Sequence, residues 1–241
     1  MDAPRTIHDF GAFPQALFDV RYPAPGSPAL AERVAALLAP LPVTLDQRWG
    51  LDHGAWSVLV HAFPQADIPV VQLSIDATRP HDYHHAIGRL LQPLRDEGVL
   101  IMGSGNVVHN LPAMDWHDPA AAYDWAQRFQ DVVQAAIAAD DPAPLIAFEA
   151  QGADAKRSIP SPDHYLPLLY IAGLADDRPL DLLVDGHVAG SISMAAYTLG
   201  LDRTPGIDPD GYETPGFDSR GAASAGDASP LPDMPMTESN V

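Results

Sequence analysis

Residues 98–111 read GVLIMGSGNVVHNL, and they carry the first indication of the fold class. The apolar run from Val99 to Met102 has the composition of a buried strand. Gly103-Ser104-Gly105-Asn106 then predicts a glycine turn, and His109 follows two valines later. Because ligands of α/β proteins bind where strands end, His109 is a candidate metal ligand or general acid/base.

The same glycine turn is a weak match to a phosphate-binding loop. In the dinucleotide fingerprint G-x-G-x-x-G a third glycine is needed, and that position is Val108 here. A turn that positions His109 at the end of a strand is therefore the better interpretation.

The segments before this stretch predict a strand–helix–strand unit. Residues 69–75 form a near-continuous apolar run, as expected of a buried parallel strand. Residues 80–97 predict a helix that Gly98 ends, and the strand 99–102 follows directly. This order indicates an α/β fold.

The remaining elements are predicted from periodicity and from capping residues. Ser27 is an N-cap candidate with proline at the first helical position. Further helices are expected at 28–38, through Trp56 and Leu59, at 119–139, 142–150 and 164–174, and strands at 43–49, 181–188 and 190–199.

The composition excludes several classes of function. The 241-residue chain carries a formal net charge of −19, so phosphate backbones and anionic membrane surfaces repel it. No apolar run approaches the ~18–20 residues that span a bilayer. With no cysteine, thiolate chemistry and cysteine metal sites are excluded, which leaves the ten histidines as metal-ligand candidates. We expect a cytoplasmic protein that binds neither nucleic acid nor membranes.

The last part of the chain differs in composition from the rest. From Leu201 onward it is rich in Gly, Pro, Ser, Ala and Asp and has no apolar periodicity. Such a segment cannot bury enough apolar surface to offset its ordering entropy. We therefore expect one domain over 1–200 and a disordered, dispensable tail over 201–241.

Three histidines have both a structural and a functional interpretation. His164 enters an apolar helix after a proline-rich loop, so it is either a core histidine bonded to a carbonyl or a ligand. His53 follows Asp52, a candidate helix cap, and is either a turn residue or a site residue. His8, flanked by aromatic residues, either contacts substrate or packs in a loop.

A second group of histidines has helical spacing. His81, His84 and His85 stand at i, i+3 and i+4, which can bind a metal ion. They lie among polar neighbours near a helix start and lack the flanking acid of a metalloprotease motif. A solvated helix face is the expected role, outside any active site.

Five blocks of sequence together resemble one family. They are TIHDFGAFP (6–14), WGLDHGAWSVL (49–59), PVVQLSID (69–76), PLRDEGVLIMGSGNVVHNL (93–111) and PDHYLPLLYIAG (162–173). The chain resembles the class III extradiol ring-cleavage dioxygenases of the B-subunit type, within them the 4,5-DOPA dioxygenase branch. The resemblance implies a single α/β domain with a mixed central sheet flanked by helices. It also implies one Fe(II) or Zn(II) ion and a catechol substrate, such as L-DOPA, that is opened with O2.

The resemblance also implies roles for individual residues. His164 matches a metal ligand, and His109 matches either a second ligand or an acid/base that moves catechol protons. His53 is the other catalytic candidate. The pocket residues implied are His8, Asp52 and Asn110. We expect the imidazoles of His109 and His164 to lie within about 8 Å of each other, as two groups around one ion would.

The match departs from the family at its beginning. Family members start with a strand and a GHGSP-type loop, followed by a SAHW-type motif, and each motif carries a metal histidine. Neither occurs here, so the resemblance implies that about the first quarter of the family domain is absent. We expect an N-terminally truncated domain with impaired activity. The alternative is a non-catalytic remnant or small-molecule-binding protein of the same fold.

Overall fold

The structure is a computed structural model that describes residues 1–11, 13–175 and 178–200. Met1–Gly200 form one compact unit that contains all of these residues. The tail expected over 201–241 lies outside the described residues. Within the described part, no helix is long and apolar enough to cross a membrane.

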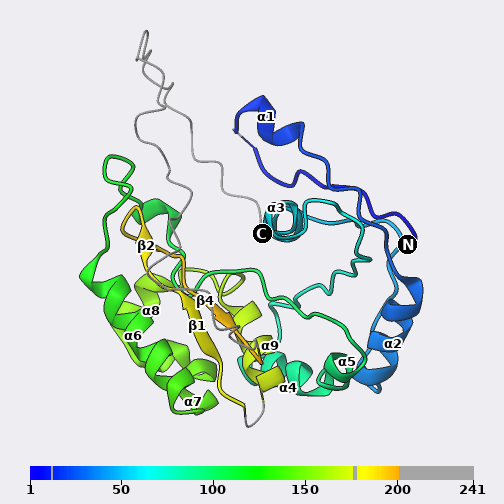
Figure 1. Ribbon diagram of the computed structural model, residues 1–241. Helices are drawn as coiled ribbons and strands as arrows, with labels where there is room; N and C mark the ends of the chain where they lie inside the picture. The colour runs from blue at the N-terminus through cyan, green and yellow to red at the C-terminus, as the bar shows by residue number, and fades with distance from the viewer. Residues whose placement is uncertain (12, 176–177, 201–241) are drawn as a thin grey trace, which may run out of the picture. The chain divides into compact units, whose positions relative to one another are not determined.

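Helices dominate the unit, and the strands are short (Figure 1). The helices are α1 (Gln15–Phe18), α2 (Pro28–Leu38), α3 (His53–Ala62), α4 (His81–Leu90), α5 (Pro93–Asp96), η1 (Leu111–Ala113), α6 (Asp124–Ala138), α7 (Pro142–Ile146), η2 (Phe148–Gln151), α8 (Ala153–Ser158) and α9 (Leu166–Ala175). The strands are β1 (Asp181–Val184), β2 (His187–Val188), β3 (Ile192–Ser193) and β4 (Ala196–Thr198).

The capping predictions for the first two long helices are confirmed. The Ser27 hydroxyl accepts a hydrogen bond from the Leu30 amide at the start of α2. The Asp52 carboxylate accepts one from the Ala55 amide at the start of α3. Each cap satisfies an amide that has no partner inside its helix.

The helix predicted over 80–97 is two helices. α4 ends at Leu90, and α5 begins at Pro93, whose ring cannot continue the hydrogen-bond pattern of the preceding turn. Gly98 ends α5 with φ +78°, a conformation that glycine adopts at little cost. The prediction that glycine closes this segment is therefore confirmed.

α4 and α9 pack together at unusually close range. A Cβ on Gly88 would overlap the carbonyl of Tyr170, and one on Gly173 would overlap the carbonyl of His85. Glycine on each helix lets the two backbones meet. The contact joins the apolar clusters on either side of it, because Leu169 on α9 belongs to one and Tyr170 to the other.

The strands expected over 181–199 form in pieces. β1 pairs with β4 and β2 with β3, both antiparallel. The chain reverses between them at Gly186 and Gly190, both with positive φ. His109 joins β3 through an isolated antiparallel bridge to Ile192, which ties the stretch 98–111 to these strands.

The described unit is a mixed α/β fold, as the sequence predicts, but three predicted strands are wrong. Residues 43–49, 69–75 and 99–102 are not assigned to any strand. Only one isolated bridge occurs there, a parallel one between Gly26 and Val70. A strand is defined by hydrogen bonds to a neighbouring strand, and within the described residues these segments have no such neighbour. The βαβ unit expected there is consequently not closed.

Candidate functional site

The residues at 103–106 do not form the predicted turn. Neither Gly103 nor Gly105 has positive φ, and the chain continues without a turn through Asn106. Glycine is needed there for close packing: a Cβ on Gly105 would overlap the carbonyl of His164, and one on Gly103 would approach Pro167 and Ile171. The glycines therefore bring this segment against the start of α9 and place His109 beside His164.

His109 and His164 lie face to face. Their ring centroids are 3.4 Å apart and the ring planes are inclined by 8°. The expectation that these imidazoles lie within about 8 Å is confirmed. His109 is held by its amide, which donates to the Ser158 carbonyl, and it follows the buried Val107 and Val108.

Asn106 determines which nitrogen of His164 carries the proton. Its side-chain nitrogen donates to the Ser193 carbonyl at 2.7 Å, so its oxygen faces His164 Nδ1 at 3.1 Å. That oxygen can only accept, so Nδ1 donates. The lone pair of His164 is then on Nε2, which is the form needed in a metal ligand or proton acceptor.

The stacked geometry limits what the pair can bind. An ion midway between parallel rings 3.4 Å apart would lie about 1.7 Å (half of 3.4 Å) out of each ring plane. Ring lone pairs lie in the ring plane and cannot converge on such an ion. The lone pairs of the two stacked rings therefore do not meet at one point between the rings.

Burial keeps both imidazoles neutral near pH 7. Burial and the neighbouring His164 lower the pKa of His109 to about 4, and the Asp163 carboxylate opposes this only in part. Burial likewise lowers the pKa of His164; Asp163 opposes this, and His53 lowers the pKa further.

His53 is anchored by an acid that the sequence analysis did not single out. Asp9 accepts hydrogen bonds from the His53 amide at 3.0 Å and from His53 Nδ1 at 2.9 Å. Burial alone would raise the pKa of Asp9, but these bonds outweigh it and hold that pKa below its usual value. The carboxylate orients the imidazole through its Nδ1.

His8 lies in an aromatic cluster next to α3. Its ring contacts those of Phe10, Phe18 and Trp56, and its Nε2 faces the Val20 carbonyl at 3.1 Å. The Trp56 indole donates to the Ile7 carbonyl, which ties this segment to α3. The packed-loop interpretation describes these contacts, and a substrate contact by His8 stays a prediction.

Asp52 and Asn110 make structural bonds in the described part. The Asp52 carboxylate caps α3 and accepts a hydrogen bond from the Gln72 amide. The Asn110 amide donates to the Arg157 carbonyl and accepts from the Ala113 amide. Their expected place in a substrate pocket stays a prediction.

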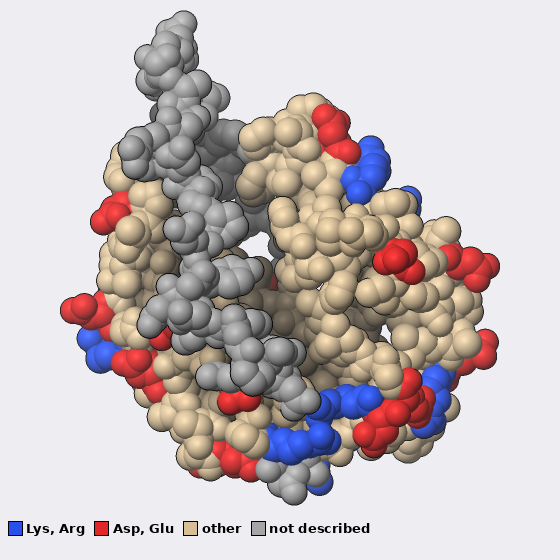
Figure 2. Space-filling view, in the orientation of Figure 1, with Lys and Arg blue, Asp and Glu red and all other residues tan. Residues whose placement is uncertain are grey.

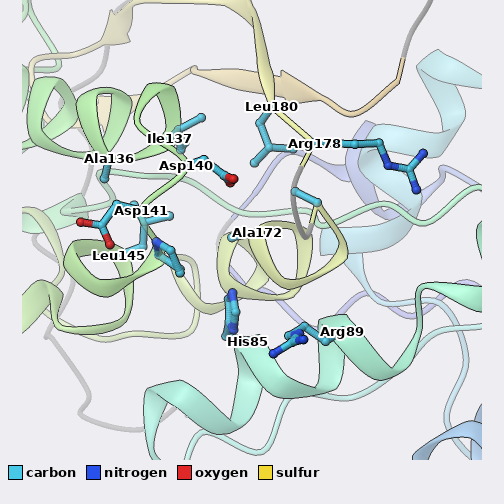
Figure 3. A pocket seen from close by; sticks show the side chains of 12 residues that line it. His85, Arg89, Ala136, Ile137, Asp140, Asp141, Leu145, Ala172, Arg178 and Leu180 are labelled. Carbon is cyan, nitrogen blue, oxygen red and sulfur yellow. The ribbon is translucent and has the colours of Figure 1, made fainter.

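The solvated helix face expected of His81, His84 and His85 is wrong for His84. That ring is fully buried, and its Nδ1 lies 3.0 Å from the Tyr170 hydroxyl. His84 points into the α4–α9 contact because α4 is covered by α9 on that side. His85 lines a separate hollow of about 210 Å³ together with Arg89 and Asp141, and no expected site residue lines it (Figure 3).

The described residues do not form a complete metal site. Among them no group of three or more His, Asp or Glu lies close enough to hold a metal ion. A mononuclear site open to substrate and O2 needs three protein ligands. The donor set present in the described part therefore does not fit a resident ion by itself.

Sequence reasoning missed two residues that organise this region, Asn106 and Asp9. Each stands inside a block that had been singled out, GSGN and IHDF. Asparagine after glycine suggests a turn, and aspartate before aromatic residues suggests no partner. Only the structure brings Asn106 to His164 and Asp9 to His53, 58 and 44 residues apart.

Comparisons with known proteins agree on one family. Residues 2–200 match the catalytic LigB subunit of aromatic ring-opening dioxygenase. The 4,5-DOPA dioxygenase extradiol of Escherichia coli is 50% identical over 206 residues, covering 83% of this chain and 75% of that protein. The 4,5-DOPA dioxygenase extradiol of Beta vulgaris is 36% identical over 205 residues, covering 82% and 75%.

A solved structure shares the fold. The crystal structure of an uncharacterized protein from Escherichia coli K12 superposes with a TM-score of 0.70 at 45% identity, covering 80% of each chain. The family match over residues 2–200 includes all five blocks of the sequence and both His109 and His164. The chain belongs to the LigB family of aromatic ring-opening dioxygenases, in its extradiol class.

Proposed function

We propose that the chain acts on a catechol such as L-DOPA, with O2 as co-substrate, at the contact between His109 and His164. The observation that carries this proposal is the stacked imidazole pair, with Asn106 directing the lone pair of His164 through Nε2. The names of the relatives, 4,5-DOPA dioxygenase extradiol, support the choice of substrate.

His164 is the residue proposed to contact the metal, and Fe(II) or Zn(II) is the proposed ion. Its Nε2 is the nitrogen left with a lone pair, which suits either ion. His109, whose ring stacks on that of His164, is the second candidate ligand. Because the described residues supply too few donors, we infer that the chain by itself binds the ion weakly and has low activity.

His109 is the proposed acid/base. It is neutral near pH 7 because burial lowers its pKa, so it can accept a proton from a catechol hydroxyl. The negative charge that develops on the catechol raises the pKa of the imidazole beside it, which favours this transfer. His53, held by Asp9, is the second proposed proton carrier.

The binding part of this proposal is tested without turnover. We expect the imidazole NMR signals of His109 and His164 to shift when L-DOPA is added anaerobically, and the exposed His117 signal to stay in place. Each of the variants His109→Ala and His164→Ala should weaken L-DOPA binding, while His117→Ala should not. Unchanged His109 and His164 signals at saturating catechol would contradict the proposed site.

A second measurement tests the inferred low activity. Oxygen uptake by the 241-residue chain with L-DOPA and Fe(II) or Zn(II) should stay near the rate without protein. Rapid uptake that His164→Ala abolishes would show that other residues complete the metal site.

A second candidate function is a non-catalytic catechol-binding protein of the same fold. The incomplete donor set of the described residues favours it. L-DOPA binding with no oxygen uptake at any metal concentration would support this alternative.

A further inference from the structure

A large groove lies on the side of the unit away from β1–β4. Its volume is about 580 Å³, and it is bounded by α2, residues 41–51, residues 70–76 and α4. On the face shown in Figure 2, charged side chains lie mainly along the outer edge. Many lining side chains are apolar, among them Val34, Leu38, Val43, Leu45, Leu73 and Ile87. Polar and charged side chains, among them Asp46, Arg48 and Gln72, line the rest of the groove.

Two segments beside this groove, 70–76 and 99–105, have no strand partner in the described part, and the second begins with the side-chain pattern of a strand. Val99 and Ile101 pack against the same apolar cluster as Leu73. Between them Leu100 is 69% exposed, and Met102 beyond them is 47% exposed. This alternation has the period of two that a strand shows. Because both faces are apolar, the pattern is that of a central strand whose second face is uncovered.

The backbone of these segments is also unpaired in the described part. No amide of residues 71–75 or 100–105 donates to another backbone group there. Such a row of free donors and acceptors is a template for an added strand. Val70, just before the first of these segments, makes a single such bond: its amide donates to the Pro25 carbonyl in a parallel bridge that ends after one residue.

The relatives contain more chain than this one matches. The match leaves 25% (100 − 75) of the E. coli 4,5-DOPA dioxygenase extradiol without a counterpart, and 20% (100 − 80) of the solved neighbour. A quarter of such a protein is enough for several strands of about five to six residues. Similar proteins thus contain additional polypeptide that is long enough to pair with the unpaired segments beside the groove.

We propose that this groove is a strand-binding site. Its occupant is a polypeptide segment equivalent to the unmatched quarter of the E. coli relative, which adds parallel strands along residues 70–76 and 99–105. Its backbone pairs with the free amides and carbonyls, and its apolar side chains cover Leu45, Leu73 and Leu100. Burial of apolar surface and closure of the hydrogen-bond ladder both favour this association.

Hydrogen exchange with the full 241-residue chain tests the proposal. The probe is a synthetic polypeptide with the sequence of the unmatched part of the E. coli relative. Amides of 71–75 and 100–105 should exchange rapidly in the chain alone and at least about tenfold more slowly with the polypeptide. Amides in α4 and α9 should be unaffected, since their bonds lie inside helices.

Paired variants separate groove binding from non-specific association. Leu45 lines the groove and is 44% exposed, so Leu45→Asp leaves the fold of the chain intact. It should weaken binding of the polypeptide at least about tenfold. Leu183, 59% exposed on β1 and away from the groove, supplies the control Leu183→Asp, which should bind as the natural chain does.

Three results would overturn the proposal. The first is rapid exchange of 71–75 and 100–105 that the polypeptide does not slow. The second is slow exchange of these amides in the chain alone, with protection that increases with protein concentration. The groove would then hold a second copy of the chain. The third is slow exchange of these amides in the 241-residue chain alone that becomes rapid when the chain is shortened to end at Gly200. Residues 201–241 would then be the occupant.

Discussion

The helices α4 and α9 are about as rich in apolar residues as the segments 70–76 and 99–105. Only the two helices, however, have a regular pattern of backbone hydrogen bonds. A helix makes its backbone hydrogen bonds within itself, so α4 and α9 need only a close neighbour, which Gly88 and Gly173 provide. A strand makes its bonds to another strand, so the backbone of 71–75 and 100–105 stays unpaired in the described part. Apolar sequence therefore specifies burial, while hydrogen-bond partners determine whether a buried segment becomes a strand.

The largest effect should come from the helix side of this comparison. Gly173→Ala places a methyl group against the His85 carbonyl and should cost about 2–3 kcal/mol of unfolding free energy. In an isolated helix the same change stabilises, so a loss identifies the close contact. Urea unfolding measures it. Gly11→Ala is the matched control, because a Cβ there meets no atom within 4 Å; equal effects of the two changes would refute the packing argument.

The next largest effect on stability is expected at Asn106, which follows segment 99–105 and bonds to His164 just before α9. Asn106→Ala removes the bond to His164 and leaves the Ser193 carbonyl without its donor, which should cost about 1–3 kcal/mol. The His164 ring should also lose its single tautomer, visible in ¹⁵N chemical shifts. Gln127→Ala, which removes an exposed bond to Asp131, is the control and should change little. A single His164 tautomer in the Asn106 variant would show that another group determines it.

A pH effect should follow from the neutral His109. Its pKa is about 4 in the folded chain and about 6.5 when unfolded, so the unfolded state takes up its proton first as pH falls. Its contribution to stability is therefore complete above about pH 6.5 and is lost progressively toward pH 4. NMR titration should give the low value, and His109→Gln should flatten the fall of the urea midpoint over this range. A titration near the ordinary histidine value of about 6.5 would contradict the burial of this ring.

The smallest effect belongs to the groove side. The Arg33 guanidinium on α2 pairs with the Glu97 carboxylate after α5 at 2.6 Å, but both side chains are exposed. Exposed ion pairs contribute little and are screened by salt. Arg33→Met should lower the thermal midpoint less than Asn106→Ala does. In high salt the thermal midpoint of Arg33→Met should equal that of the natural chain. A shift that persists in high salt would mean that this pair holds α2 in place.

Several features could be read from the residues alone. The caps at Ser27 and Asp52, the glycine end at Gly98, and the positions of α6 and α9 are local, because each depends on residues a few positions apart. The resemblance carried by the five blocks also brought His109 and His164 to one place, as the structure confirms.

Tertiary structure alone decided the rest. Gly105 was expected to form a turn, but the His164 carbonyl beside it is the reason for glycine there. His84 was expected in water, but α9 covers it. The strands expected at 43–49, 69–75 and 99–102 depended on partners that periodicity cannot supply. Sequence determines which residues tend toward burial and which cap a helix locally, whereas pairing, close approach and the Asn106–His164 bond arise only when distant segments meet.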